Sequence, residues 1–394
     1  MPTHKILEFY SGIGGMHYAA LLANWDAQVL KAFDINTTAN EIYAYNFGKR
    51  TVTQRNIEAL SLDFYDKLEA NIWTMSPPCQ PYTRTGLKNG SKDVRAKSFL
   101  YLMDMLPKMK HPPSYILVEN VKGFEDSDTR NLLVEALITS NYTFQEFLLT
   151  PLQLGIPNSR LRYYLLAKRR PLCFAIAPTT TLLGYVPFSE RLNREFVDKR
   201  GQLVKDETEM EGLVVEDLRG YLENGEEVNV EEFLVPENIL IKYGRAFDIV
   251  KPSSKRSCCF TKGYHHYVEA TGSILQMAED LDTTTIFNTY DALLLQHQQS
   301  VPVSSSDRPL ASPSSPSATA IKPQSLPPPP EAIAILHSLR LRYFTPREVA
   351  NLMGFPPNFG FPDSINLKQK YRVLGNSVSV KVVAELMRYL VRDV

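Results

Sequence analysis

The fold class is decided by the stretch Leu7–Met16, which reads LEFYSGIGGM. Apolar residues over 5–9 predict a short strand, the glycine-rich run breaks it, and residues 16–23 predict a helix. A strand, a tight glycine turn and a helix together form the first unit of an α/β domain. Glycines at a helix N-terminus let a ligand approach free N–H groups, although a tight turn without a ligand explains them equally well.

The same alternation of strands and helices continues to about residue 170. Further strands are predicted over 28–33, 71–75, 115–118, 145–149 and 162–167, which favours a parallel α/β sheet. Ligands of such sheets bind where the strands end. The residues at those ends are Ser11, Asp34, Ser76 and Glu119, all of them polar or charged.

The rest of the chain is less regular. We expect a first domain over 1–175, a second over 176–340, and a C-terminal segment, 341–394, that returns to the first. The second contains an acidic loop, 206–232, with eleven acids and one base, and a flexible insert, 301–330, with nine prolines and eight serines. Thr345 and Pro346 predict a helix start, and 378–392 predict a final amphipathic helix.

Composition excludes several classes of protein. Hydrophobic residues make up 44% and charged residues 22%, values of a globular chain rather than a disordered one. No apolar run reaches the roughly 18 residues that a membrane span needs, and the N-terminus lacks a signal-peptide stretch. Four cysteines without a CxxC motif predict neither a disulfide framework nor a metal site. We therefore expect a reduced, intracellular protein.

Charge is unevenly distributed. Lys and Arg together number 43, as do Asp and Glu, so the formal net charge is zero. The acidic loop carries −10, which leaves +10 on the remaining chain. A moderately basic body permits a polyanionic partner without proving one.

A carboxylate stands where a nucleoside would need it. Asp34 lies 19 residues past Gly15, at the end of the second strand, and suits ribose hydroxyls. The loop does not continue as G-x-G-x-x-G, the pattern of pyrophosphate sites. A nucleoside without phosphates fits better, and S-adenosylmethionine is the common one.

The sharpest local feature is the stretch Ser76–Pro81, which reads SPPCQP. Its three prolines in five residues fix a rigid loop directly after a strand. Most cysteines are buried small hydrophobes, but Cys79 is held in this loop and is favoured as a nucleophile.

Two further pieces carry charge at strand ends. Glu119 follows three residues of buried type, so it needs a partner or a function, and a salt bridge is its plain alternative. Arg160 and Arg162 are predicted on one face of a strand and suit carboxylate or phosphate recognition, unless that face is simply exposed.

Taken together and in this order, these pieces resemble the cytosine-C5 methyltransferase family. The resemblance includes Gln153, Pro157, Arg160 and Arg162 in a Q-x-x-x-x-P-x-x-R-x-R pattern, and the GNSV run at 375–378. Within the family, the CFTKGY run at 259–264 is similar to one branch, the tRNA (cytosine-38-C5) methyltransferases, once named as a second DNA methyltransferase. The acidic loop and the Ser/Pro insert match nothing in that pattern.

The resemblance implies a Rossmann-like S-adenosylmethionine-dependent methyltransferase fold. The first domain would be catalytic, and the second a small, irregular target-recognition domain. The implied substrate is cytosine 38 in the anticodon loop of aspartate tRNA. The residues implied for S-adenosyl-L-methionine are Phe9, Ile13, Gly14, Gly15, Asp34, Ile35, Asn56, Ile57, Ser76 and Asn376, although many members carry Asp in place of Asn56.

The implied catalytic residues are Cys79, Glu119, Arg160 and Arg162. The thiolate would add to carbon 6 of the base and activate carbon 5. Glu119 would donate a hydrogen bond to ring nitrogen 3, so we expect burial to raise its pKa and keep it protonated. Arg162 would orient the base through its carbonyl, and Arg160 would hold Glu119 or a phosphate.

Basic and aromatic residues around the CFTKGY run predict an RNA-facing patch, with a solvated basic loop as the alternative. The patch consists of Lys251, Lys255, Arg256, Lys262 and Tyr264, with His265 and Tyr267 nearby.

Three other functions remain open. A DNA cytosine methyltransferase would use the same chemistry, but the chain has no large basic target domain. An idle nucleic-acid binder need not keep the catalytic set, and a nicotinamide oxidoreductase would need the missing G-x-G-x-x-G. We expect a monomer in the cytoplasm, and also in the nucleus, with no membrane association.

Overall fold

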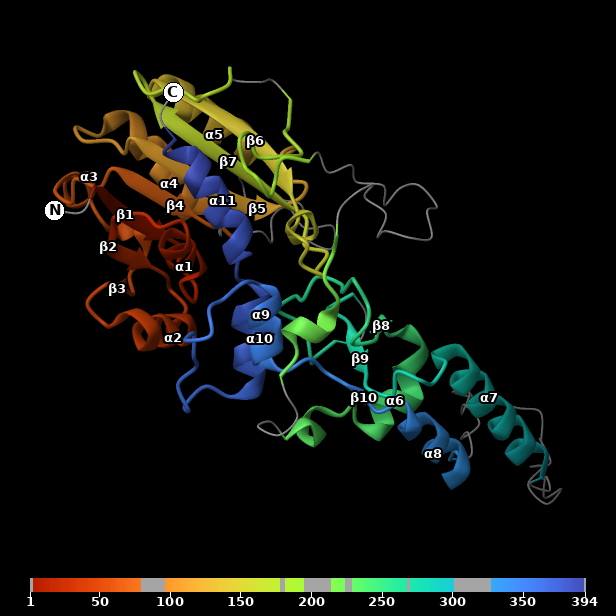
Figure 1. Ribbon diagram of the computed structural model, residues 1–394. Helices are drawn as coiled ribbons and strands as arrows, with labels where there is room; N and C mark the ends of the chain where they lie inside the picture. The colour runs from red at the N-terminus through yellow and green to blue at the C-terminus, as the bar shows by residue number, and fades with distance from the viewer. Residues whose placement is uncertain are drawn as a thin grey trace, which may run out of the picture.

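A seven-stranded sheet forms the centre of the larger part of the molecule (Figure 1). The computed structural model describes residues 3–78, 96–177, 181–194, 214–223, 229–267, 270–300 and 327–392. The strand order is β3-β2-β1-β4-β5-β7-β6. The strands are β1 (His4–Phe9), β2 (Ala27–Phe33), β3 (Val52–Thr53), β4 (Ile72–Met75), β5 (Tyr115–Val121), β6 (Tyr142–Leu149) and β7 (Arg162–Arg169).

The sheet is mixed rather than parallel. Strands β1 to β5 pair in parallel, as predicted, but β7 is antiparallel to both β5 and β6. The expectation of a wholly parallel sheet is therefore wrong at this edge. The α/β class itself is confirmed.

Successive side chains of each strand point to opposite faces of the sheet, so each strand contributes to two cores. On β1, Ile6 joins the core that contains α1 (Gly15–Leu22), α2 (Thr37–Phe47) and α11 (Val380–Leu390). The next residue, Leu7, joins the core on the opposite face. The helices of that face are α3 (Leu62–Asp66), α4 (Lys97–Met105) and α5 (Asp128–Thr139). The sheet is thus covered on both faces, and its strand ends are free to form a site.

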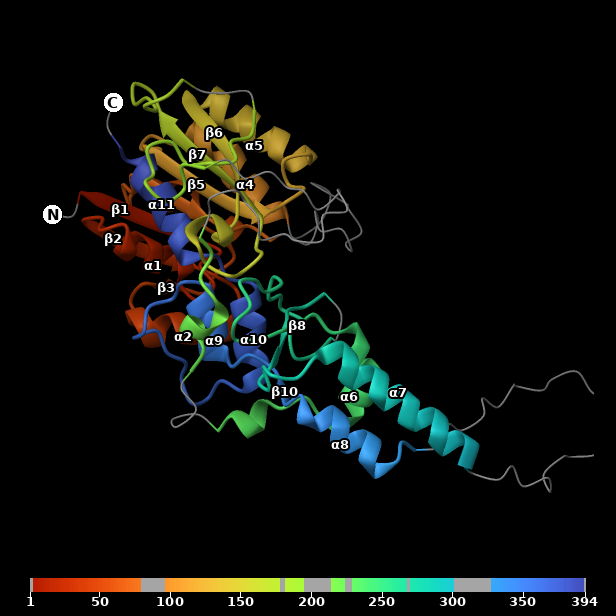
Figure 2. The same cartoon turned by 45° about the vertical axis from the view of Figure 1, so that its right-hand side comes forward.

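The smaller part holds a three-stranded sheet of order β10-β9-β8 (Figure 2). Its strands are β8 (Ile249–Val250), β9 (Ile274–Gln276) and β10 (Leu341–Arg342). Helices α6 (Glu237–Tyr243), α7 (Thr283–Ser300) and α8 (Pro330–Ser338) lie around it, and α9 (Pro346–Leu352) and α10 (Leu367–Gly375) lie between the two parts.

The C-terminal segment returns to the first sheet. Thr345 caps α9 as expected, and its hydroxyl accepts a hydrogen bond from the Glu348 N–H. Helix α11 packs against α1 and β7, so the last residues of the chain complete the core formed by the first. No helix of the described residues is both long and apolar enough to span a membrane.

The acidic stretch is only partly a solvated loop. Within 214–223, one of its two described parts beside 229–232, Leu218 and Tyr221 are buried, and the Glu223 carboxylate accepts a hydrogen bond from Thr345. This part of the acidic stretch is therefore not an exposed loop, because its apolar residues pack into the core. Most of the Ser/Pro insert, 301–326, lies outside the described residues.

Candidate active site

One cavity of about 610 Å³ opens at the carboxyl ends of the parallel strands. All four predicted strand-end residues line it, namely Ser11, Asp34, Ser76 and Glu119. Because they follow β1, β2 and β4 and lie near the end of β5, the sheet topology brings them together from distant sequence positions. The size is typical of a small-molecule site.

Close packing explains the glycine-rich turn. Gly14 caps α1 with φ +85°, a conformation that favours glycine, and a methyl group there would overlap the Phe47 ring. A methyl group on Gly15 would lie 2.7 Å from Val378 Cγ2. The turn therefore touches α2 on one side and the C-terminal segment on the other.

The cavity is not lined by every residue predicted for the cofactor. Phe9 is 1% exposed and stacks on Phe33 in the core, with ring centroids 5.1 Å apart. Ile13 is also 1% exposed, and neither it nor Gly14 is among the lining residues. Phe9, Ile13 and Gly14 therefore lie behind the lining, and their contact with the cofactor stays a prediction. The predicted residues that do line the cavity are Gly15, Asp34, Ile35, Asn56, Ile57, Ser76 and Asn376.

The Asp34 carboxylate is fixed by backbone donors. Its two oxygens accept hydrogen bonds from Gly12 N and Asn36 N, each 2.8 Å long. Burial raises the pKa of Asp34, and these N–H groups partly offset that effect. Ile35, which follows it, is 70% exposed and presents an apolar side chain at the cavity.

At the other end of the cavity, an acid lies beside two arginines. Glu119 is 8% exposed within β5, rather than just beyond its end, and Arg162 Nε lies 3.6 Å from its Oε1. Burial raises the pKa of Glu119, and Arg162 and Arg160 reduce that rise without cancelling it. The direction agrees with the expected protonated form.

Arg160 has different partners from those expected. It precedes β7, and its guanidinium donates to the carbonyl oxygens of Phe260 (3.3 Å) and Ser377. Within the part of the chain that the structure describes, Arg162 rather than Arg160 pairs with Glu119. The pairing of Arg160 with Glu119, one of its two predicted roles, is therefore not observed, because its guanidinium donates to two backbone carbonyls. Its other predicted role, contact with a phosphate, stays a prediction. Both arginines do line the cavity.

Cys79 lies outside the described residues, so its position is not part of the observed geometry. The described chain reaches the cavity wall at Pro77 and Pro78, directly before it. The Asn120 amide donates a 3.5 Å hydrogen bond to the Pro77 carbonyl, which ties that approach to β5.

A second cysteine lies between the two arginines. Cys259 Sγ is 3.3 Å from Arg160 Nη1 and 3.5 Å from Arg162 Nη2. Burial alone would raise the pKa of this thiol, but the two guanidiniums outweigh it and the pKa is lowered. The sequence offered this residue only as part of the CFTKGY run.

Tyr10 is a lining residue that the sequence did not single out. Its backbone is left-handed, with φ +56°, and its hydroxyl lies 2.9 Å from Ser98 Oγ at the start of α4. A bulky residue with positive φ is a strained feature that gathers at functional sites. The hydrophobic pattern of a sequence does not show which residues have a left-handed backbone, so the sequence did not mark Tyr10.

The predicted RNA-facing residues do not form one patch. Lys262 is exposed and lines the cavity, and Lys255 is exposed. Lys251 donates to the carbonyl oxygens of two residues near β9, and Arg256 pairs with Asp248 at 2.8 Å. The side chains of Lys251 and Arg256 are therefore engaged within the protein.

Tyr264 is a clear correction. Its ring is 4% exposed, and its hydroxyl donates to the Ser273 carbonyl and accepts from the Phe344 N–H. A stacking contact of this ring with RNA is therefore wrong, because the ring belongs to the core. Tyr267, three residues later, is 65% exposed.

Comparison with known proteins identifies the family. The family model described as C-5 cytosine-specific DNA methylase matches residues 4–392. The chain belongs to this family. A tRNA (cytosine(38)-C(5))-methyltransferase of Rattus norvegicus is 41% identical, over 99% of this chain and 100% of the relative. A DNA (cytosine-5)-methyltransferase of Dictyostelium discoideum is 35% identical, over 99% of this chain and 95% of the relative.

Solved structures agree with the observed fold. A mutant of Spodoptera frugiperda DNMT2 is 37% identical, with a TM-score of 0.74, and the match covers 99% of this chain and 100% of that one. The predicted C-5 cytosine methyltransferase family is thus confirmed, and with it an enzyme of this type.

The two ends of the cavity suit the two ligands of a cytosine methylase, a nucleoside cofactor and a base. One end offers a fixed carboxylate, an apolar surface and a glycine turn, as a nucleoside needs. The other offers a buried acid with a raised pKa and two guanidiniums, which can recognise a polar heterocycle.

Proposed function

We propose that this chain transfers a methyl group from S-adenosyl-L-methionine to carbon 5 of cytosine 38 in the anticodon loop of aspartate tRNA, through a covalent adduct of Cys79. The observation that carries the proposal is a cavity with a nucleoside end and a base end in a C-5 cytosine methylase. The names of the relatives direct it to tRNA.

The nucleoside end fits the cofactor. The Asp34 carboxylate would accept hydrogen bonds from the ribose hydroxyls. Backbone N–H groups at 2.8 Å already fix the position of its two oxygens. Ile35 and Ile57 would face the adenine, and Gly15 leaves room beside the methionine portion. Ser76 and Asn376 would close the cavity from two sides. When bound, S-adenosylmethionine supplies an electrophilic methyl group.

The base end would activate cytosine. The Cys79 thiolate adds to carbon 6, and the electron pair moves toward carbon 5 and nitrogen 3. Glu119, kept protonated by burial, donates a hydrogen bond to nitrogen 3 and stabilises the charge that develops there. Arg162, 3.6 Å from Glu119, is placed to hold the carbonyl of the base. Once carbon 5 has taken the methyl group and S-adenosylhomocysteine has left, loss of the proton on carbon 5 would expel the thiolate and restore the ring.

An unpaired base favours RNA over duplex DNA. A base in an anticodon loop is already free, whereas extrusion from a duplex costs a few kcal/mol. Lys262 at the cavity and the exposed Tyr267 would contact the loop through a phosphate and a base. Because one relative, from Dictyostelium, is named a DNA (cytosine-5)-methyltransferase, duplex DNA is the alternative substrate.

The proposal is tested by transfer of labelled methyl groups. Total tRNA, an unmodified aspartate tRNA transcript and a CpG duplex are each incubated with wild type and with Cys79→Ala. We expect label on tRNA with wild type and none with the variant. Label on the duplex alone would support a DNA methyltransferase, and undiminished label with Cys79→Ala would refute the nucleophile.

A further inference from the structure

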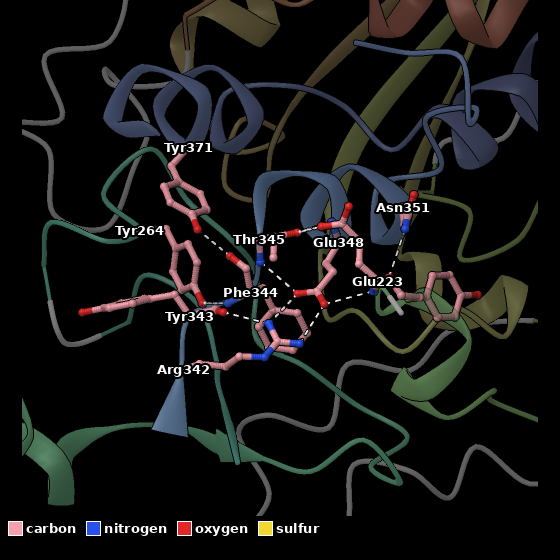
Figure 3. A network of polar contacts seen from close by, with 10 residues as sticks. Glu223, Tyr264, Arg342, Tyr343, Phe344, Thr345, Glu348, Asn351 and Tyr371 are labelled. Carbon is pink, nitrogen blue, oxygen red and sulfur yellow. Dashed lines mark hydrogen bonds and ion pairs between the residues drawn. The ribbon is translucent and has the colours of Figure 1, made fainter. Parts of the chain in front are cut away.

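The peptide groups of Phe344 are held by two tyrosine hydroxyls. The Phe344 N–H donates a 2.9 Å hydrogen bond to Tyr264 Oη, and the Phe344 carbonyl accepts one of 2.5 Å from Tyr371 (Figure 3). The Tyr264 hydroxyl also donates to the Ser273 carbonyl at 2.7 Å. The Tyr264 hydroxyl therefore joins the stretch 264–273 to Phe344, which is 80 residues away in the sequence.

The Phe344 segment is itself rigidly anchored. Arg342 and Glu348 form a bidentate pair, with both hydrogen bonds 2.8 Å long and side chains 1% and 0% exposed. Glu348 also accepts from the backbone N–H groups of Thr345 (2.8 Å) and Glu223 (3.1 Å) (Figure 3). A fully paired buried carboxylate of this kind leaves the backbone beside it little freedom.

The loop that precedes Tyr264 lies directly on the cavity wall. A methyl group on Gly375 would overlap the peptide between Thr261 and Lys262, so only glycine allows this contact. Arg160 bridges the same two segments, because it donates to both the Phe260 and the Ser377 carbonyls. The place of Lys262 at the cavity thus depends on how the loop is held.

We infer that Tyr264 is a positioning residue, which pins the loop Phe260–Lys262 against the Gly375 turn and so places Lys262 at the cavity without touching either ligand. The inference rests on the proposed function only where it concerns nucleic acid. Burial raises the pKa of Tyr264 far above its ordinary value, so the hydroxyl keeps its proton, and with it the hydrogen bond that it donates to the Ser273 carbonyl, at any working pH.

A double-mutant cycle in the full chain tests the inference. Tyr264→Phe removes the two hydrogen bonds and keeps the ring, and Lys262→Ala removes the side chain that the loop presents. We expect Tyr264→Phe to lower kcat/KM for tRNA about tenfold. We also expect kcat/KM of the double variant to be no lower than that of the poorer single variant, because both changes remove the same contribution, that of Lys262 at the cavity. Binding of S-adenosylhomocysteine should change less than twofold.

Tyr389→Phe is the matched control. This buried tyrosine, on α11, donates 2.8 Å to Gln145 Oε1 away from the cavity, so the change removes a comparable hydrogen bond. We expect its kcat/KM to stay near wild type. An equal loss in Tyr389→Phe would mean general destabilisation, and would overturn the inference. Multiplicative losses from Tyr264→Phe and Lys262→Ala would do the same.

Amide hydrogen exchange separates this inference from the proposed function. We expect Tyr264→Phe, but not Tyr389→Phe, to speed exchange in peptides that cover 259–267. Unchanged exchange there would contradict the inference whatever the substrate. Activity on duplex DNA in place of tRNA would contradict the proposed function. The double-mutant cycle of Tyr264→Phe and Lys262→Ala could then be measured with the duplex as substrate.

Discussion

A single carboxyl group decides the chemistry at the residue scale. Glu119 can donate to a base only while it is protonated, and burial raises its pKa in that direction. The nearby Arg162 works against this, so the acid is held between two opposing influences. Such balanced groups are common where a proton is used.

Removal of the Glu119 carboxyl should affect turnover more than binding. We expect Glu119→Gln to lower kcat by about 10²-fold or more, as loss of an acid catalyst does, with tRNA affinity near wild type. In wild type, kcat should fall as pH rises through the raised pKa of Glu119. Single-turnover rates and filter binding measure the two quantities. Lost tRNA binding at an unchanged rate would show a structural role instead.

A second buried acid controls stability rather than catalysis. Burial raises the pKa of Glu8 to about 8, and the Tyr43 hydroxyl, which donates to it at 2.9 Å, opposes the rise. Because the folded state holds this proton more firmly than the unfolded state, stability is lost as pH rises from about 4.5 toward 8.

Glu8→Gln removes that dependence. We expect the Tm of Glu8→Gln to rise relative to that of wild type between pH 6 and pH 8.5. The neutral amide has no proton to lose, and its oxygen can still accept a hydrogen bond from Tyr43. Glu135→Gln, at an exposed position, is the control for the Glu-to-Gln change itself. A Tm difference between Glu8→Gln and wild type that stays constant with pH would contradict the raised pKa.

At the scale of elements, caps tie the helices into the core. Thr345 caps α9 in a capping box, and its hydroxyl also donates to Glu223. Asn366 caps α10 in the same way but is exposed. The two caps therefore differ mainly in burial.

That difference predicts unequal losses of stability. Asn366→Ala should lower the free energy of unfolding by about 1 kcal/mol, the usual value for a cap, and Thr345→Ala by about 2 kcal/mol, because a buried partner loses its donor as well. Urea unfolding measures both. Equal losses would mean that the contact with Glu223 adds nothing.

Sequence patterns predicted six of the seven strands of the large sheet, without β3, but not every pairing. Periodicity is the same for parallel and antiparallel neighbours, so the reversed β7 left no trace in it. Strands β8, β9 and β10 span only two or three residues, too few to show any alternation. The cap at Thr345 was predictable because capping is a local property.

The whole molecule places the cavity between its parts. The lining comes from the ends of β1, β2, β4 and β5, from the loop that carries Lys262, and from 373–378. The motifs predicted most of this set, since each marks a strand end or a turn. They could not show that Phe9 and Tyr264 are buried, because burial depends on contacts with distant segments.

The central claim concerns one base in one RNA. The most direct measurement compares labelled methyl transfer to an aspartate tRNA transcript with transfer to the same transcript carrying uridine in place of cytosine 38. We predict label on the first transcript and none on the second. Equal label on both transcripts would contradict the claim.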